Sequence, residues 1–477
     1  MKLNMKNILS RIAAAAVVAV CAACMWSCSE EDDYTFAFNS PALYFREPGQ
    51  TQTVSYRTVW VSNVTVSSVP EGWSATLDPV LRSVTVTAPE SFEPDDEKDT
   101  TPVESGTLTL RGYNRKGTIV SASVYVTMTE TVDLSESLAN SYVITNPEVR
   151  YLIDVSHNPA GEELAVASIK TVWTTSSSLI RYQTLTDDGK MSFMAGKKDD
   201  TVSSGNALVA AYDAAGNILW RWHLWVTPVD PEADVVSIGG RSYMSSNLGA
   251  YKHDNSDNDA ILASYGLYYQ WGCPVPFIGP RYYNCASGYN TYIYDSSGLS
   301  VYVTPEESES GNSTLDYVLE NPLAFITCLE TARTGSDGAE AWSDDVKTIY
   351  DPCPAGWRVP QSGSFDGLSI VAAELAEDIE SLNGRYGWTL TDGAAEAFFF
   401  AGGRRNYLNG SIENMNTMET PRPWTGYYWT SGLDATRSTA YGMYFNLNTE
   451  DAALSVLEPQ RGLQLSNGLQ IRCVRDE

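Results

Sequence analysis

Short runs in which apolar and polar residues alternate constrain the fold of this chain more than any other feature. Such runs cover residues 84–86, 108–110 and 120–126, and a further one covers residues 149–155. A period of two places the apolar side chains on one face of a β-strand. Many short strands of this kind predict β-sandwiches. We therefore expect two all-β sandwiches, over residues 36–131 and 132–232.

The second of these segments contains three tryptophans within six residues. A turn at Gly216 is followed by a strand on which Trp220 and Trp222 share one face with apolar neighbours, whereas Trp225 shares the other face with Arg221 and His223. Aromatic rings fill sandwich cores, and they also stack on sugars. We interpret Trp220 and Trp222 as core residues and keep Trp225 as a candidate ligand contact.

The first residues have the features of a secretory signal. Basic residues precede an apolar run over residues 12–24, which is too short to cross a bilayer as a permanent helix. Cys28 follows Ser27 at the edge of this run and is followed by the acidic residues 30–33. We expect residues 1–27 to be cleaved, Cys28 to carry lipid and residues 28–35 to form a tether. Lipidation at Cys24, or cleavage without lipidation, are the alternatives.

The sequence CSEEDD that begins at Cys28 resembles the surface-export signal of Bacteroidota lipoproteins. The resemblance implies a lipid-anchored protein on the outer face of the outer membrane. The chain has 59 acidic and 31 basic residues and a net charge of −28. This charge opposes nucleic acid and anionic lipid as partners and suits solubility outside the cell.

Cysteines and histidines limit the metal chemistry of the exported part. Beyond Cys28 it has five cysteines, which include no CxxC pair, and only three histidines occur in the chain. This pattern predicts no zinc site and no cofactor. In an oxidising compartment one or two disulfides are expected, with at least one thiol left over.

The familiar sequence signatures of catalysis are also missing. We find no GxSxG, HExxH, Walker or GxGxxG pattern and assign no catalytic residues. A glycosidase needs only two carboxylates that the fold brings together, and 59 acidic residues leave that alternative open. The expectation is a protein that is not an enzyme.

The first segment, residues 36–131, resembles a known family of modules. The sequences PEGWSATLD, SVTVTAP and SGTLTL are similar to those of BACON and BACON-like immunoglobulin-type modules. The family name refers to carbohydrate binding, but the resemblance is also compatible with a spacer, and we favour the spacer.

Residues 235–477 carry a more specific resemblance. SYMSSNLGAY, ASYGLYYQWG, DPCPAGWRVPQSGSFDGL, AGGRRNYLNG, GYYWTSG and LQIRCVRD occur in the order found in the Fibrobacter succinogenes major paralogous domain. This pattern is in turn similar to the C-type-lectin-like fold, which implies an α+β domain. From the residues we expect one helix after Ser362 or Ser364, with apolar positions from Phe365 to Ile379, and a final antiparallel sheet that includes LQIRCVR.

The same resemblance implies a disulfide between Cys353 and Cys473, because both lie inside family blocks that a lectin-like arrangement brings together. A local bridge between Cys273 and Cys285, with Cys328 left as a thiol, is an additional or competing pairing. Burial of the cysteines as separate thiols is the remaining alternative.

A tyrosine-rich stretch in this domain is the better candidate for ligand contact. Its tyrosines show no core-like periodicity and lie among turn-forming residues; they are Tyr282, Tyr283, Tyr289, Tyr292 and Tyr294. Exposed tyrosines suit both glycan and protein ligands. We therefore expect a surface-exposed lipoprotein that binds or adheres without catalysis. A fimbrial or tip subunit and a glycan-processing enzyme are the alternatives.

Overall fold

The computed structural model describes residues 34–94, 101–199, 201–279, 293–335, 338, 340–371, 386–413, 424–447 and 454–477. The chain divides into two compact units between Glu130 and Thr131. We call residues 34–130 the first unit and residues 131–477 the second unit.

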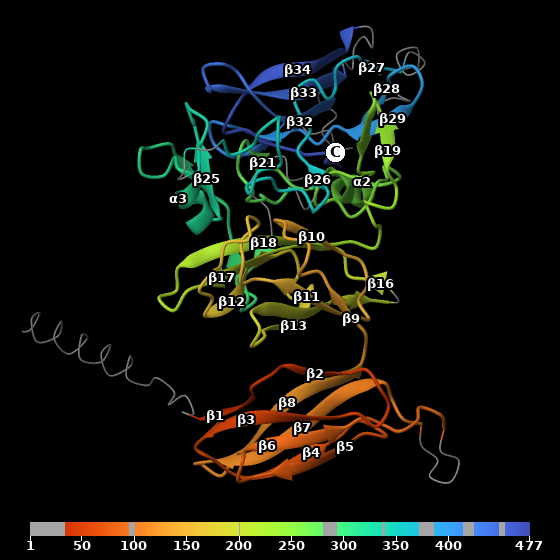
Figure 1. Cartoon of the computed structure of the whole chain (residues 1–477), viewed down its shortest axis with the longest axis vertical. Helices are drawn as coiled ribbons and strands as arrows, with labels where there is room; N and C mark the ends of the chain where they lie inside the picture. Colours follow the sequence, from red (N-terminus) through yellow and green to blue (C-terminus); the bar gives the residue numbers. More distant parts are fainter. Residues whose placement is uncertain are drawn as a thin grey trace, which may run out of the picture. The chain divides into compact units, whose positions relative to one another are not determined.

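The first unit is a sandwich of two four-stranded sheets (Figure 1). One sheet has the order β1 (Thr35–Phe38), β3 (Thr51–Val59), β6 (Ser83–Thr87), β5 (Ser74–Asp78). The other has the order β2 (Ala42–Phe45), β8 (Ile119–Met128), β7 (Ser105–Asn114), β4 (Val61–Ser68). Neighbours are antiparallel except β2 and β8. This order is that of an immunoglobulin-type sandwich.

The alternation in the sequence accounts for this unit's core. Val84, Val86, Leu108 and Leu110 are fully buried, whereas their polar neighbours face outward. Inward side chains of both sheets form one cluster. Trp73 belongs to it and donates from its indole Nε1 to the carbonyl of Val103, 2.7 Å away. The first unit therefore has a complete core of its own.

The second unit begins with a sandwich of the same strand order. One sheet runs β13 (Ile180–Leu185), β14 (Lys190–Ala195), β11 (Arg150–Asp154), β9 (Thr131–Asp133). The other begins β10 (Ser141–Ile144), β18 (Ile218–Val226), β17 (Gly205–Tyr212), β12 (Ser168–Thr174). A hairpin of β15 (Lys197–Lys198) and β16 (Thr201–Val202) precedes β17. The strand order of this sandwich is thus also of the immunoglobulin type, in agreement with the expected all-β, immunoglobulin-like fold.

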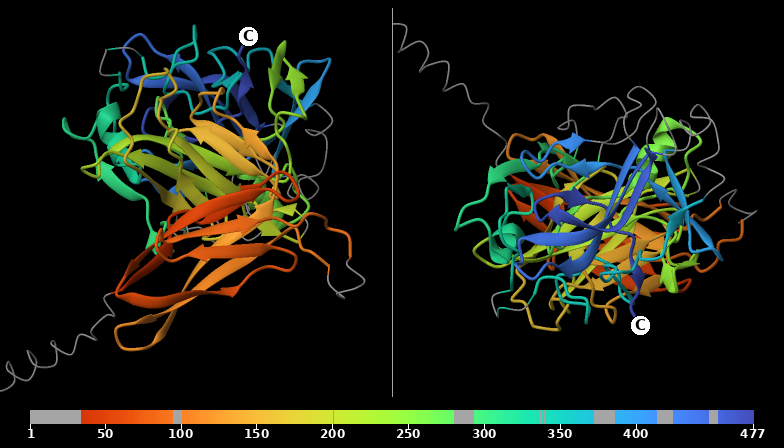
Figure 2. Two further views of the ribbon diagram at one scale, coloured as in Figure 1. Left: turned by 60° about the horizontal axis from the view of Figure 1, so that its bottom comes forward. Right: turned by 90° about the horizontal axis from the view of Figure 1, so that it is seen from above.

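In the described residues, the rest of the second unit consists of strands, most of them short, and two helices, above this sandwich (Figures 1 and 2). One sheet has the order β19 (Val236–Ile238), β20 (Arg241–Tyr243), β36 (Val474–Arg475), β26 (Trp357–Arg358). A second has β21 (Tyr269–Gln270), β35 (Gly468–Leu469), β30 (Arg404–Arg405), β31 (Ile412–Glu413). Smaller sheets pair β24 (Thr304–Glu307) with β25 (Ala324–Thr327), and β28 (Gly387–Thr391) with β27 (Ser369–Ile370) and β29 (Glu396–Phe400). The helices are α2 (Asn258–Tyr265) and α3 (Leu315–Glu320).

The expected boundary between residues 232 and 235 does not separate compact units. A hairpin of β22 (Ile293–Tyr294) and β23 (Ser300–Val301) extends the sandwich sheet beyond β12, where Thr174 pairs with Tyr294. One hydrophobic cluster runs from the sandwich to the last residues of the chain. The second sandwich and the C-terminal part are therefore one body, because they share a core and a sheet.

The helix expected after Ser362 or Ser364 does not begin there. Residues 362–367 form turns and are followed by β27. Gly363 and Gly367 have φ angles of +73° and +77°, which are incompatible with a continuous helix. Phe365 and Leu368 are buried as the apolar spacing requires. The later positions of the expected helix, over residues 372–385, lie outside the described residues.

The expected final antiparallel sheet is present in three of its four strands: β32 (Trp424–Leu433), β33 (Thr439–Leu447) and β34 (Val456–Gln464). The fourth segment, LQIRCVR, joins other sheets as β35 and β36. The reason is Arg472, which is buried and donates to the carbonyl of Ser245 and to Asn247 Oδ1, each at 3.0 Å. It holds the last segment against residues 244–247.

Candidate functional site

The structure separates the predicted site residues into three groups. Cys28 and the tyrosines Tyr282, Tyr283, Tyr289 and Tyr292 lie outside the described residues. Tyr294 lies in β22, where it is half-buried and pairs with the edge of the sandwich sheet. The described part of the proposed tyrosine surface is therefore a structural strand.

Trp225 is a core residue, and its interpretation as a ligand contact is wrong. The side chain has no exposed surface, and its Nε1 donates to the carbonyl of Ala250 at 2.6 Å. The face of β18 that carries Trp225, Arg221 and His223 is buried as completely as the face that carries Trp222. The C-terminal part covers this second face, which a lone sandwich would leave in water.

Cys353 and Cys473 form a disulfide, with Cα atoms 6.0 Å apart. This is the pairing that the family resemblance implies, and its Cα separation is typical of disulfides. Cys273 and Cys328 are thiols, and Cys285 lies outside the described residues. Around Cys353, the Asp351 carboxylate accepts from the backbone N–H groups of Cys353 and Val359, at 2.9 and 2.8 Å. The loop that precedes β26 is thereby fixed against the last strand.

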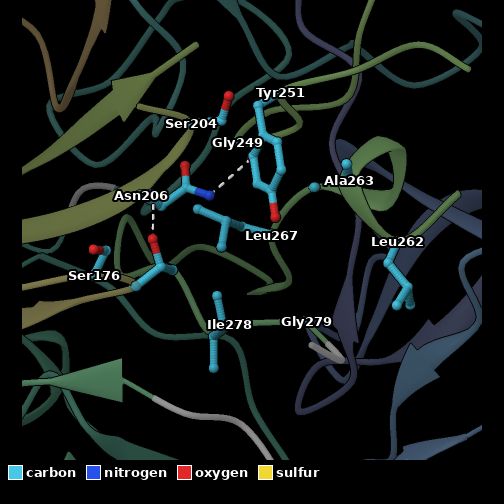
Figure 3. Close-up of a pocket in the computed structure, with 12 residues that line it drawn as sticks. Ser176, Ser204, Asn206, Gly249, Tyr251, Leu262, Ala263, Leu267, Ile278 and Gly279 are labelled. Atoms are coloured by element: carbon cyan, nitrogen blue, oxygen red, sulfur yellow. Dashed lines mark hydrogen bonds between the residues drawn. The ribbon is translucent and has the colours of Figure 1, made fainter. Parts of the chain in front are cut away.

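A pocket of about 140 Å³ lies where the second sandwich meets the C-terminal part. We call it the junction pocket (Figure 3). The sandwich supplies hydroxyl and amide side chains from the loop after β12 and the start of β17: Thr175, Ser176, Ser204 and Asn206. The C-terminal part supplies Tyr251 and the apolar residues Leu262, Ala263, Leu267 and Ile278, with Gly249, Gly266 and Gly279. Polar groups therefore face an aromatic and aliphatic wall.

The junction pocket opens into a wider groove of about 850 Å³. The two share Ser176, Ser204, Tyr251, Leu262 and Ala263. The hairpin of β15 and β16 adds Lys197, Lys198 and Asp199 along the groove, and Lys252 and Asp259 lie on its other side. Basic and acidic side chains are mixed here, and Lys197 is paired with Glu148 at 2.5 Å. The groove is therefore polar without a strong net charge.

Two glycines allow the wall of the pocket to close. Gly249 and Gly266 have φ angles of +82° and +76°. A Cβ at Gly249 would stand 2.5 Å from Leu267 Cγ, and one at Gly266 would stand 2.6 Å from the carbonyl oxygen of Leu248. Asp257 begins α2 by accepting from the backbone N–H of Ala260 at 2.8 Å. These local requirements position Leu262 and Ala263 beside Tyr251.

Asn206 is fixed by hydrogen bonds on both ends of its amide. Its Nδ2 donates to the carbonyl of Gly249 at 2.9 Å, as Figure 3 shows, and its Oδ1 lies 2.8 Å from His223 Nε2. His223 Nδ1 lies 3.0 Å from Ser141 Oγ, which is 2.6 Å from the carbonyl oxygen of Pro352. Burial lowers the pKa of His223 to about 3, so the ring is neutral. This network connects the sandwich to the C-terminal part behind the pocket.

The types Ser141, His223 and Asn206 also occur in nucleophilic catalysis, but their geometry here does not support it. All three are at least 98% buried, and the Ser141 hydroxyl is already engaged by His223 and the carbonyl of Pro352. At Asp154, Ser156 and His157 both the carboxylate and the hydroxyl contact the same ring nitrogen, Nδ1. A relay requires the two partners on opposite ring nitrogens. Both groups are therefore structural.

The described residues form neither a cluster of metal ligands nor a membrane-spanning helix. In that part of the chain, no group of three or more His, Cys, Asp or Glu side chains is placed to hold a metal ion. No helix there is both long and apolar enough to cross a bilayer. Asp254, in the acidic stretch before α2, accepts from the backbone N–H and hydroxyl of Ser256, at 2.9 and 2.7 Å.

Comparisons with known proteins leave the family open. No family model matches the chain, and no curated protein matches it. Among solved structures, a domain of intimin aligns at 11% identity and a TM-score of 0.16, over 40% of this chain and 96% of that one. A titin I-band fragment aligns at 15% identity and a TM-score of 0.14, over 40% and 64%. The Bacteroides ovatus mixed-linkage glucan utilization locus protein SGBP-B, in complex with a heptasaccharide, aligns at 12% and 0.12, over 39% and 43%. These TM-scores are too low to support an argument.

The pocket residues were not found by sequence reasoning. Tyr251 ends the block SYMSSNLGAY, and Asn206 follows Gly205 at the start of a strand, so both belong to segments that were interpreted for their fold alone. The one feature of the sequence that marks them is a polar side chain next to a buried strand. That signal does not reveal that the two segments meet.

Proposed function

We propose that this protein is a surface-exposed lipoprotein, anchored through Cys28, that binds a glycan in the junction pocket and its groove without catalysis. The observation that carries the binding function is the junction pocket itself, in which serine hydroxyls face Tyr251 and an aliphatic wall. Sugars present hydroxyl groups and apolar C–H faces together, so this combination suits them. The secretory signal and the acidic run after Cys28 support the location.

We further propose that the first unit is a BACON-like module and that residues 235–477 form a Fibrobacter succinogenes major paralogous domain with a C-type-lectin-like fold. Support comes from the way the family blocks meet. Tyr243, in the first block, pairs with Val474 in the last, and Arg358 in the central block pairs with the same residue. The disulfide lies beside this meeting point.

A glycan array probed with the unlipidated chain from Tyr34 to Glu477 tests the proposal. Ser204 is exposed at the rim of the pocket, so Ser204→Trp fills the cavity without disturbing a core. Tyr251→Ala removes the aromatic wall. Both variants are expected to weaken glycan binding at least tenfold, because a pocket ligand depends on a few convergent contacts. Ser237→Trp, at an exposed serine of β19 outside the pocket and groove, is the matched control and should bind as the parent does.

Other results would select the alternatives. Saturable hydrolysis of a bound glycan would replace the binding function with an enzyme. Glycan binding that survives Ser204→Trp and Tyr251→Ala would place the site elsewhere. Strand-exchanged filaments would favour a fimbrial subunit, although Arg472 and the disulfide hold the last strand in place. Mass spectrometry of the N-terminal peptide from the native host checks the anchor, and an unmodified Cys28 would contradict it.

A further inference from the structure

One end of the first unit collects the tight turns of its sandwich. β3 ends at Val59 and β4 begins at Val61, so Trp60 alone joins them. The register Ser55–Ser83 brings the turn between β5 and β6 to the same end, and the register Val61–Asn114 brings the turn between β7 and β8 there. We call this end of the sandwich the apex.

The apex displays a cluster of large apolar side chains. Val80 is 88% exposed, Leu81 73% and Trp60 51%. Val59, Tyr113 and Ile119, at the ends of the adjoining strands, are also exposed. Single exposed apolar residues are ordinary, but six at one end of a sandwich, on its turns and the adjoining strand ends, are a group of the kind that marks an interaction site.

Hydrogen bonds fix the turn between β5 and β6, which carries Val80 and Leu81. Asp78 Oδ1 accepts from the backbone N–H groups of both Val80 and Leu81, each at 2.9 Å. The carbonyl of Arg82 accepts from the N–H of Tyr56 in β3 at 2.9 Å, which joins this turn to the sheet. Trp60 and Arg82 have φ angles of +60° and +52°. Such backbone conformations are unfavourable for large residues and persist only where the surroundings impose them.

Basic side chains accompany the apolar ones, in contrast to the acidic chain as a whole. Arg82 lies in the turn with Val80 and Leu81, and Arg115 and Lys116 lie in the turn between β7 and β8. The Arg115 guanidinium stacks over the Trp60 ring. Aliphatic tips, indole and phenol rings, and neighbouring arginine or lysine are the combination found at the boundary between lipid headgroups and acyl chains.

The described chain begins at the apex end of the first unit. β1 begins beside the apex, where Thr35 pairs with Val59, so the described chain starts at this end of the sandwich. Cys28 stands six residues before Tyr34, a span of at most about 20 Å. β8 starts at the apex and runs to the opposite end, where the chain leaves the unit. The proposed lipid anchor is thus tethered to the apex side.

We propose that the apex is a membrane-docking surface, in which Val80, Leu81 and Trp60 enter the headgroup region of a lipid bilayer and Arg82, Arg115 and Lys116 contact lipid phosphates. This goes beyond glycan binding and assigns the first unit a role of its own. The choice of a bilayer over a protein partner rests in part on the proposed anchor at Cys28. The residues of the apex are proposed to bind a bilayer whether or not Cys28 carries a lipid.

Vesicle sedimentation of the unlipidated chain from Tyr34 to Glu477 tests this proposal. Vesicles of phosphatidylcholine alone and of phosphatidylcholine with one quarter phosphatidylglycerol are the two probes. We expect binding to both and tighter binding to the second. The double variant Val80→Ser with Leu81→Ser should lower partitioning roughly tenfold or more, because membrane affinity scales with the apolar area that is buried.

The matched control is Val346→Ser with Leu299→Ser, which removes the same two side-chain types at sites 60% and 66% exposed in the second unit. It should leave partitioning unchanged. Arg115→Gln with Lys116→Gln should abolish the preference for phosphatidylglycerol and retain binding to phosphatidylcholine. Unchanged circular dichroism in all variants confirms that the folds are intact.

Three results would overturn the proposal. Equal partitioning of the parent and the Val80, Leu81 variant would show that the apex does not insert. Binding to phosphatidylglycerol alone, lost in salt and insensitive to that variant, would show adsorption by charge. An absence of vesicle binding, with a dimer that the same variant dissociates in sedimentation velocity, would make the apex an interface between two copies. An unmodified Cys28 in the native protein changes none of these measurements.

Discussion

The two sandwiches have the same strand order, yet they are stabilised in different ways. The first closes a core from its own eight strands, and its Trp73 finds a hydrogen-bond partner within the unit. The second buries both faces of β18 and uses the C-terminal part to do so. Two sandwiches with the same topology can therefore differ in whether they fold alone, because this depends on which faces of their sheets another part of the chain has to cover.

The contrast is clearest in the polar contacts at the ends of the second sandwich. Asn140 Nδ2 donates to the carbonyls of Ile349 and Asp351, at 2.7 and 2.8 Å, and Trp225 donates to Ala250. Each of these acceptors lies beyond residue 235. Without the C-terminal part these buried groups would lose their partners, and an unpaired buried polar group costs about 1 to 3 kcal/mol.

Dissection of the chain should give the largest difference between the two sandwiches. Residues 34–130 alone are expected to fold and unfold cooperatively, because their core is complete. Residues 131–232 alone should not fold, since the covered face of β18 would be open to water. Amide exchange and thermal unfolding by circular dichroism would measure both, with residues 131–477 as the folded control. A cooperative transition in residues 131–232 would contradict the comparison.

Loss of the disulfide should affect only the second unit. The bridge spans 120 residues, for which the chain-entropy model gives a contribution of roughly 4 to 5 kcal/mol. Cys353→Ala with Cys473→Ala should lower the unfolding free energy of the second unit by up to that amount. The first unit, which has no cysteine between Tyr34 and Glu130, should melt as before. Complete alkylation of Cys353 and Cys473 in the native protein without reductant would show that the bridge is absent.

Mild acid should lower the stability of the second unit more than that of the first, but by less than the loss of the disulfide does. Burial lowers the pKa of His223 to about 3 in the folded protein, from an ordinary value of 6.5. The unfolded chain therefore binds a proton below pH 6.5 that the folded chain does not. The contribution of neutral His223 to the free energy of unfolding is fully present above pH 6.5 and is lost as pH falls toward 3. About 2 kcal/mol of it is lost at pH 5.

Denaturant unfolding at pH 7.5 and pH 5 would measure this loss. The first unit contains no histidine and should lose less stability. His223→Gln should remove the part of the pH dependence that belongs to this ring, although it will also lower stability at pH 7.5. Equal acid sensitivity of the parent and this variant would exclude His223 as the cause.

The sequence predicted the structure correctly where a pattern arises from the burial of neighbouring residues in one strand. The period-two runs over residues 120–126 and 149–155 predicted strands correctly, because alternation reports burial on one face of a strand. The apolar positions Phe365 and Leu368 are buried as expected, but their spacing did not produce a helix. Two glycines with positive φ angles at 363 and 367 decided that outcome.

The site could not be predicted in the same way. The junction pocket requires Ser176, Asn206, Tyr251 and Leu267 to meet, and no local periodicity records such a meeting. Trp225 was misinterpreted for the same reason, since its exposure depends on whether another part of the chain covers that face of β18. The apex was overlooked because single residues in turns, such as Trp60 and Val80, do not form a pattern until the strands are paired.

The β22–β23 hairpin has a consequence for how such a chain can be rearranged. Although it lies some 120 residues after β12 in sequence, it completes the edge of the sheet to which β12 belongs. A recombination event or a designed fusion that cuts near residue 232 would therefore divide a single sheet between two gene products. The break that preserves both parts is the one between Glu130 and Thr131. Recombination could therefore exchange two parts of this protein as intact folds, residues 34–130 and residues 131–477, and not three.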